Sequence, residues 1–133
     1  MSLANFIVFP DLGDSRGSLV VMDDLAGLPF KIRRAYYLFG SSIKESRGFH
    51  AHKTLHQVAV CISGACKMVL DDGEVRDEFW LDSPFRAIEL PPLVWHEMHD
   101  FSEDCVLLVL ADNYYDEADY LRNYEDFLER VSV

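Results

Sequence analysis

Two histidines separated by one residue stand in the segment Arg47-Gly48-Phe49-His50-Ala51-His52-Lys53. If this segment is a β-strand, alternate side chains point to the same face, so the imidazoles of His50 and His52 lie side by side. Imidazoles change protonation near neutral pH and can act as general base or general acid. The flanking bases Arg47 and Lys53 favour a site for an anionic molecule.

One chemistry that uses such a pair is metal binding. Metal-binding cupin barrels carry His-x-His, a Glu three or four residues later, a Gly six beyond, and a third His in a later motif with Pro. Here Gly64 fits, and His96 follows Pro91-Pro92, but His56 or Gln57 fills the Glu position. A nitrogen-rich site could still form, with ligands from His50, His52, His56 and His96. Because the carboxylate is missing, the sequence favours a site without metal.

The other chemistry is metal-free proton transfer. Removing a proton from the carbon beside a ketone needs a positioned base, and the resulting enolate oxygen needs a hydrogen-bond donor or a cation. Two histidines on one face can divide these roles. Tyr36 and Tyr37 are neighbours on a predicted strand and point to opposite faces, so at most one can readily offer its hydroxyl.

Short β-strands are predicted to position these residues. Apolar or alternating runs end at turn residues throughout the first 111 positions, which predicts strands over residues 5–9, 18–23, 32–39, 56–63, 65–70, 74–81, 85–90, 95–101 and 105–111. The turn Asp71-Asp72-Gly73 is a strong hairpin signal. Eight or more short strands at this spacing are typical of an all-β sandwich or barrel.

The last segment changes to a helical period. Apolar residues recur at the spacing of one helix face, at Tyr120, Leu121, Tyr124, Phe127, Leu128 and Val131. Asp116, Glu117 and Asp119 stand where they would favour a helix N-terminus. We therefore predict a short C-terminal helix packed on the barrel.

The composition indicates one domain, residues 1–133, with enough apolar residues for a sizeable core. No apolar run approaches the ~20 residues of a membrane span, and no signal peptide is expected. Cys61, Cys66 and Cys105 lie inside apolar runs and are expected to be reduced core residues of a cytoplasmic protein.

The net charge of −11 argues against a nucleic-acid partner, because binding the phosphate backbone needs a basic surface. The charge is uneven: residues 1–67 carry 8 Lys/Arg and 5 Asp/Glu, whereas residues 68–133 carry 4 and 18. An anionic small molecule is therefore expected to bind the first half, near the bases Arg16, Arg33, Arg34, Arg47 and Lys53.

At these residues the sequence resembles the dTDP-4-keto-6-deoxyglucose 3,4-ketoisomerases, small cupins of the WxcM-like family that act in deoxysugar biosynthesis. Five blocks carry the resemblance, and they span almost the whole chain: residues 14–19 (DSRGSL), 34–37 (RAYY), 47–53 (RGFHAHK), 94–101 (VWHEMHDF) and 114–117 (YYDE).

The resemblance implies an all-β cupin fold, the double-stranded β-helix or jelly roll, with the short helix at its C-terminus. It also implies a homodimer with exchanged N-terminal strands, a dTDP-linked keto sugar as substrate, and neither metal nor cofactor. His50 and His52 become the catalytic pair.

Related deoxysugar 3,5-epimerases carry a similar Arg-Gly-x-His segment in which the Arg holds the diphosphate, which favours Arg47 in that role here and Arg16 as a second candidate. Trp95 could pack against the sugar or the base, or belong to the core. The predicted substrate-binding set is Arg47, Arg16, Tyr36, Tyr37, Lys53, Trp95 and His96.

The predicted reaction is an intramolecular oxidoreduction through an enediol, which moves the ketone of the sugar from C4 to C3. The alternatives are a 3,5-epimerase, a metal-dependent cupin enzyme, and a sugar-nucleotide binding module without catalysis. The sequence leaves open which histidine takes the C3 proton, which configuration C4 acquires, and what His56 does.

Overall fold

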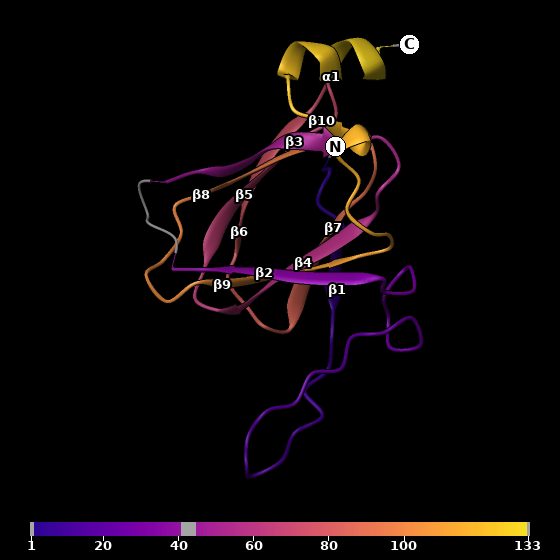
Figure 1. Ribbon diagram of the computed structural model, residues 1–133. Helices are drawn as coiled ribbons and strands as arrows, with labels where there is room; N and C mark the ends of the chain where they lie inside the picture. The colour runs from indigo at the N-terminus through magenta and orange to yellow at the C-terminus, as the bar shows by residue number, and fades with distance from the viewer. Residues whose placement is uncertain (1, 41–44, 133) are drawn as a thin grey trace.

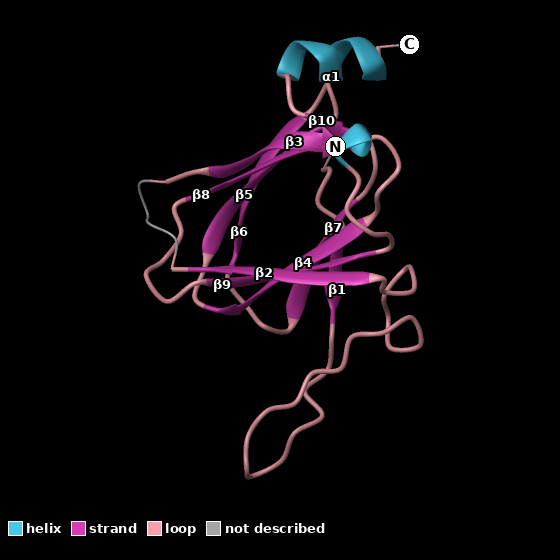
Figure 2. Ribbon diagram, viewed as in Figure 1, coloured by secondary structure: helices cyan, strands magenta, loops and turns pink. Residues whose placement is uncertain are grey.

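A computed structural model describes residues 2–40 and 45–132 (Figure 1). Its strands form two five-stranded antiparallel sheets that face each other, with one helix at the C-terminal end (Figure 2). The first sheet has the order β1 (Phe6–Val8), β7 (Arg86–Leu90), β4 (Gln57–Ser63), β9 (Val106–Ala111) and β2 (Arg34–Phe39). The second has the order β10 (Tyr120–Leu121), β3 (Arg47–His52), β8 (Trp95–His99), β5 (Cys66–Asp71) and β6 (Arg76–Leu81).

The predicted all-β class with a short C-terminal helix is confirmed. One face of each sheet packs on the other sheet, so apolar side chains fill most of the space between them. The core between the sheets includes Met68, Leu70, Ile88 and Leu107. The predicted hairpin at Asp71 joins β5 to β6.

The prediction of a strand over residues 18–23 is wrong. These residues belong to a segment that projects from the barrel beyond β1 and β2 (Figure 1). Its only backbone pairings in the described chain are an Asp14–Gly17 bridge and the bond from the Leu12 N–H to the Leu19 carbonyl, 2.7 Å. A strand needs a continuous partner. This segment, residues 12–22, which we name the arm, has none among the residues that the structure describes.

A β-bulge interrupts β3 just before the two histidines, between Gly48 and His50. Gly48 pairs with Glu97 and His50 with His96, so Phe49 is an extra residue without a partner on β8. Gly48 and Phe49 have φ angles of 90° and 61°. The extra residue shifts the alternation by one, so that Arg47 and His50 face the same side of the sheet.

The C-terminal helix begins later than predicted. Tyr120 and Leu121 form β10, which pairs with His52 and Ala51 of β3, and the helix α1 spans Tyr124–Val131. The Asn123 side chain accepts a hydrogen bond from the Asp126 N–H and caps the helix. The acidic residues before it form a short 3₁₀ turn, Glu117–Asp119, instead of the α-helix N-terminus.

No helix in residues 2–40 or 45–132 has the length and apolar character that crossing a bilayer requires.

Candidate active site

A cavity of about 340 Å³ opens between the two sheets. Its polar lining comes from three arginines, two histidines and three tyrosines: Arg34, Arg47, Arg122, His50, His96, Tyr36, Tyr115 and Tyr120. Apolar side chains form the rest of the wall, among them Leu38, Met68, Met98 and Leu107. The cavity therefore combines titratable groups, positive charge and an apolar wall.

Three imidazoles cluster at this cavity. The ring centroids of His50 and His52 are 5.0 Å apart, and those of His50 and His96 are 4.5 Å apart. One ring nitrogen from each of the three lies within 4.8 Å of the others. The expectation that His50 and His52 share a face therefore holds, and His96 joins them from the neighbouring strand.

Hydrogen bonds fix the tautomers of the predicted catalytic pair. The Nδ1–H of His50 donates to the Gly48 carbonyl at 3.1 Å, and the Nδ1–H of His52 donates to an oxygen of Asp119 at 3.2 Å. Each ring is thereby left with an Nε2 lone pair that can accept a proton.

Burial keeps the cluster neutral. Desolvation lowers the pKa of His50, and it lowers that of His52 to about 4, with His50 adding to this shift and Asp119 opposing it. The pKa of His96 lies well below its ordinary value because the ring is buried. Neutral imidazoles are the form that removes protons.

Asp119 supports His52 and was missed as a site residue. Its carboxylate also accepts hydrogen bonds from the backbone N–H and hydroxyl of Thr54, both 2.8 Å, and from the Leu55 N–H at 3.2 Å. Burial alone would raise its pKa, but these hydrogen bonds from Thr54 and Leu55 outweigh it and keep the pKa below the ordinary value. The helical spacing had placed this residue at a helix N-terminus, which hid its contact with β3.

The two tyrosines of β2 point to opposite faces, as predicted. Tyr36 lines the cavity, and its hydroxyl donates to Oε1 of Gln57 at 2.6 Å. Burial raises the pKa of Tyr36 to about 12, so the hydroxyl keeps its proton. Tyr37 is exposed on the outer face, where its ring stacks on Phe39, and it cannot contact a molecule in this cavity.

Positive charge at the cavity comes from both halves of the chain. Arg34 and Arg47 belong to the predicted basic set, whereas Arg122 comes from the acidic half. The Arg122 guanidinium lies 4.0 Å from the ring centre of Tyr120 and pairs with Glu117 at 2.7 Å. Three guanidinium groups suit the oxygens of a phosphate or diphosphate.

Three other predicted binding residues lie away from the cavity of their own chain. Arg16 is on the arm, 88% exposed, and pairs with Asp14. Lys53 is half-buried, and its Nζ donates to the Ala118 carbonyl at 3.0 Å. Trp95 points to the outer face of its sheet, because strand alternation that brings His96 inward turns Trp95 outward, under α1.

His56 does not join the histidine cluster. Its Nε2 is 2.6 Å from a Glu89 oxygen, and its ring lies 5.2 Å from that of Phe30. Gln57, the next residue, faces inward instead. The described residues that could bind a metal here are therefore three histidines without a carboxylate.

The predicted substrate-binding set lacked four residues of the cavity: Arg34, which was expected only as a member of the basic set, and Tyr115, Tyr120 and Arg122. A signal for Arg34 was present, because it stands two residues before Tyr36 on the same strand. Tyr120 and Arg122 had been assigned to a helix, and the sequence offers no pattern for a strand of two residues.

The fold and the cavity define a small cupin-type β-barrel with a histidine-lined interior. The family model described as "FdtA: WxcM-like, C-terminal" matches residues 3–132. The chain belongs to this family.

Three proteins of known activity resemble this chain over nearly its whole length. The chain is 52% identical over 126 residues to the TDP-4-oxo-6-deoxy-alpha-D-glucose-3,4-oxoisomerase of Aneurinibacillus thermoaerophilus, covering 95% of this chain and 91% of the relative. It is 39% identical to a histidine-to-asparagine variant of QdtA, a 3,4-ketoisomerase from Thermoanaerobacterium thermosaccharolyticum, solved with TDP-4-keto-6-deoxyglucose; the match covers 99% and 96% of the two chains, with a TM-score of 0.94. A 3,4-ketoisomerase from Helicobacter canadensis is 36% identical, covers 100% of both chains and has a TM-score of 0.95.

Proposed function

We propose that this protein is a sugar-nucleotide 3,4-ketoisomerase that converts TDP-4-keto-6-deoxyglucose to a TDP-3-keto-6-deoxyhexose. The observation that carries the proposal is the cluster of neutral imidazoles in a cavity with arginines at its wall, in a chain 52% identical to a 3,4-oxoisomerase. The same cavity accounts for an anionic substrate, because Arg47 and Arg122 offer charge to a diphosphate.

The chemistry needs no external oxidant. A base removes the C3 proton, the C3–H bonding pair forms a C3–C4 double bond, and the C4 carbonyl becomes an enolate oxygen. A proton moves from the C3 hydroxyl to this oxygen, the C3 carbonyl forms, and C4 takes up a proton. The substrate and the product are isomers, so atoms and electrons balance.

We assign removal of the C3 proton to His50 and a supporting role in proton transfer to His52. His50 lines the cavity directly, whereas His52 is buried behind it, with its Nδ1–H held by Asp119. His96 would line the sugar subsite, and Tyr36 would contact the sugar at its edge. Binding energy from the nucleotide diphosphate positions the ring for this local chemistry.

The direct test is proton NMR of TDP-4-keto-6-deoxyglucose in D₂O with the metal-stripped protein. We expect a 3-keto product with deuterium at C4, and its coupling constants will give the C4 configuration. Deuterium at C3 or C5 without movement of the carbonyl would instead identify an epimerase. Activity that returns only with added divalent metal would identify a metal-dependent enzyme.

The histidine roles have their own test. His50→Asn and His52→Asn should each lower kcat by about 10²–10⁴-fold, the usual contribution of a positioned acid or base. His99→Asn is the matched control, because His99 faces outward and bonds to Glu97 at 2.8 Å. Nearly full turnover by both cavity variants would overturn the assignment.

We further propose that the chain acts as a single cupin domain, in a cytoplasmic homodimer with exchanged arms. The Cys61 sulfur lies 3.6 Å from that of Cys105 and 3.7 Å from that of Cys66. Both distances are well beyond a disulfide bond, which supports a reducing compartment. Arg16 can reach a cavity only in another copy, so its predicted contact with the diphosphate depends on this exchange.

A further inference from the structure

Four buried side-chain nitrogens have no hydrogen-bond partner in the described part of the chain. One, Nε of Arg86, lies elsewhere, beside the ring of Phe6. The other three are Nε of Arg34, Nε2 of Gln57 and Nε2 of His52. Nε2 of His52 is an acceptor, because the ring proton is on Nδ1, whereas the Arg34 and Gln57 nitrogens are donors. Unsatisfied buried donors cost about 1–3 kcal/mol each, so two of them at one site point to a ligand that satisfies them.

Sheet register brings Arg34 and Gln57 together. Both residues pair with Ala111 of β9, one from each side, so their side chains lie on the same inward face with one strand between them. Tyr36, which is on the same strand as Arg34, bonds to Gln57 at 2.6 Å and closes this small group.

The Gln57 amide has a fixed direction. Because Tyr36 keeps its proton and donates to Oε1, the amide oxygen is occupied and the two N–H bonds remain available as donors. Gln57 is only 1% exposed, so water outside the cavity cannot take its hydrogen bonds. This residue stands where metal-binding cupins carry a carboxylate, and it offers a donor there in place of an acceptor.

Arg34 supplies the charge. Its guanidinium carbon lies 5.2 Å from the ring centre of Tyr36 and 5.9 Å from that of Tyr115, and the side chain lines the cavity. None of the carboxylates in the described residues forms an ion pair with it, whereas Arg16, Arg76 and Arg122 are all paired.

We propose that Arg34 and Gln57 form the oxyanion site of the isomerase: their N–H groups bind the C4 oxygen of the keto sugar and stabilise it as the enolate develops. This inference rests on the proposed function. It makes both side chains catalytic residues, since they touch the reacting oxygen. A guanidinium and an amide that donate to a developing negative charge, next to an apolar wall, lower the barrier to enolate formation.

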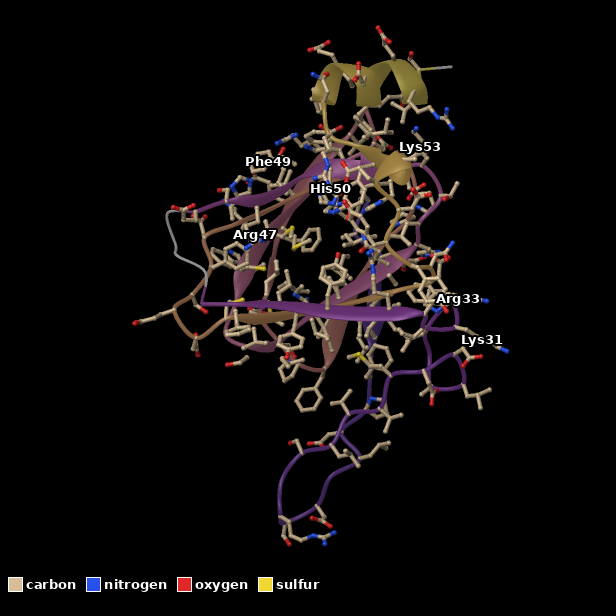
Figure 3. All side chains as sticks on the ribbon, in the orientation of Figure 1. Lys31, Arg33, Arg47, Phe49, His50 and Lys53 are labelled. Carbon is tan, nitrogen blue, oxygen red and sulfur yellow. The ribbon has the colours of Figure 1, made fainter. Side chains whose placement is uncertain are left out.

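The experiment compares Arg34→Lys, Arg34→Gln and Gln57→Glu with the wild type. We expect kcat to fall by about 10²–10³-fold in Arg34→Gln and Gln57→Glu, the usual effect of losing an oxyanion donor. Arg34→Lys should recover part of the loss, because it restores charge without the planar fork. Arg33→Gln is the matched control, since Arg33 is exposed at the edge of β2, away from Arg47 and His50 (Figure 3).

Three further readouts separate catalysis from folding and binding. Affinity for TDP alone should stay within about twofold of the wild type, because TDP lacks the keto oxygen; the urea midpoint reports folding. Deuterium exchange into C3 of recovered substrate should fall in step with kcat, because exchange also passes through the enolate. The Arg34→Gln, Gln57→Glu double variant should lose less than the product of the single losses, since both donors serve one oxygen.

A kcat within about threefold of the wild type for both single variants would overturn the inference. A loss of TDP affinity equal to the loss of kcat would also overturn it, by making Arg34 a diphosphate ligand. In either case wild-type conversion of the keto sugar leaves the proposed function intact. A wild-type protein that binds TDP without converting the sugar would instead show the proposed function to be wrong.

Discussion

His52 shows how opposing interactions set the state of one side chain. Burial and the neighbouring His50 lower its pKa, while the Asp119 carboxylate raises it without restoring the ordinary value. The result is a neutral imidazole whose Nδ1–H is committed to Asp119 and whose Nε2 is free. The carboxylate therefore acts on the tautomer and orientation of the ring more than on its charge.

Asp119→Asn tests this positioning role. Loss of the negative charge removes the preference for the Nδ1–H tautomer, so we expect kcat to fall about 10-fold or more with little change in KM. The pKa of His52 should fall further, which moves the acidic limb of the kcat profile to lower pH. Nitrogen NMR of the imidazole will report the tautomer directly.

Asp126→Asn is the control for that variant, because Asp126 lies in the first turn of α1 and carries the same charge. An Asp119→Asn protein with an unchanged pH profile and tautomer would show that the carboxylate only holds the Thr54 loop.

The buried imidazoles also predict how stability depends on pH. In the unfolded chain a histidine gains its proton near pH 6.5, whereas folded His52 does so only near pH 4. Between these values the unfolded state binds more protons, so stability is lost as the pH falls. For His52 the loss approaches about 3 kcal/mol by pH 4, at 1.36 kcal/mol per pKa unit.

Urea unfolding at pH 7.0, 5.5 and 4.5 will measure this loss. The difference between the wild type and His52→Gln isolates the histidine from the carboxylates, which also titrate there. We expect the variant to lose less stability over this range; equal losses would contradict the assignment of a depressed His52 pKa.

At the scale of elements, the bulge in β3 decides which side chains meet. In a regular strand Arg47 and His50 would face opposite sides of the sheet, because they are three residues apart. The extra residue Phe49 brings both to the cavity, opposite Met98 and His96. A Cβ at Gly48 would lie 2.9 Å from the His96 carbonyl oxygen, so the close approach of β3 to β8 also requires glycine.

Substitutions at Phe49 test the bulge. Asn adopts positive φ angles readily, so Phe49→Asn should keep most of the activity. Val resists them by roughly 1–2 kcal/mol, so Phe49→Val should raise KM and lower kcat, each several-fold, as Arg47 and His50 lose their common direction. Both variants remove the ring contact with His99, so steady-state kinetics of the pair separates backbone conformation from that contact.

If Phe49→Asn and Phe49→Val lose equal activity, the loss comes from removal of the phenyl ring and not from the backbone conformation of the bulge.

At the scale of the molecule, the outer face of the first sheet is incompletely covered. Tyr37 and Phe39 are 61% and 68% exposed. The arm beside them has few backbone partners of its own. Exposed apolar surface next to an unpaired extended segment favours association with a second copy through strand exchange.

Sedimentation equilibrium will test this association. We expect a dimer for the wild type and a shift toward monomer for Phe39→Asp, because a buried carboxylate without a partner opposes association. Trp80→Asp is the control, since Trp80 is a large, half-exposed residue on the other sheet. A monomeric wild type would contradict the exchanged-arm dimer.

Patterns along the chain were enough to predict most strands, the hairpin at Asp71, the common face of His50 and His52, and the family resemblance. Each depends on local spacing: alternation sets the face of a strand residue, and turn residues set its ends. The opposite directions of Tyr36 and Tyr37 followed from the same rule.

Which polar residues share the cavity depends on contacts between segments that are far apart in the chain. The contact of Asp119 with His52 joins residues 67 apart in sequence, the strand at Tyr120 exists only because β3 pairs with it, and the bulge at Phe49 appears only against β8. The unsatisfied nitrogens of Arg34 and Gln57 become a site only through their shared neighbour Ala111. Register, burial and hydrogen-bond satisfaction are properties of strands in pairs, so no pattern along one strand can report them.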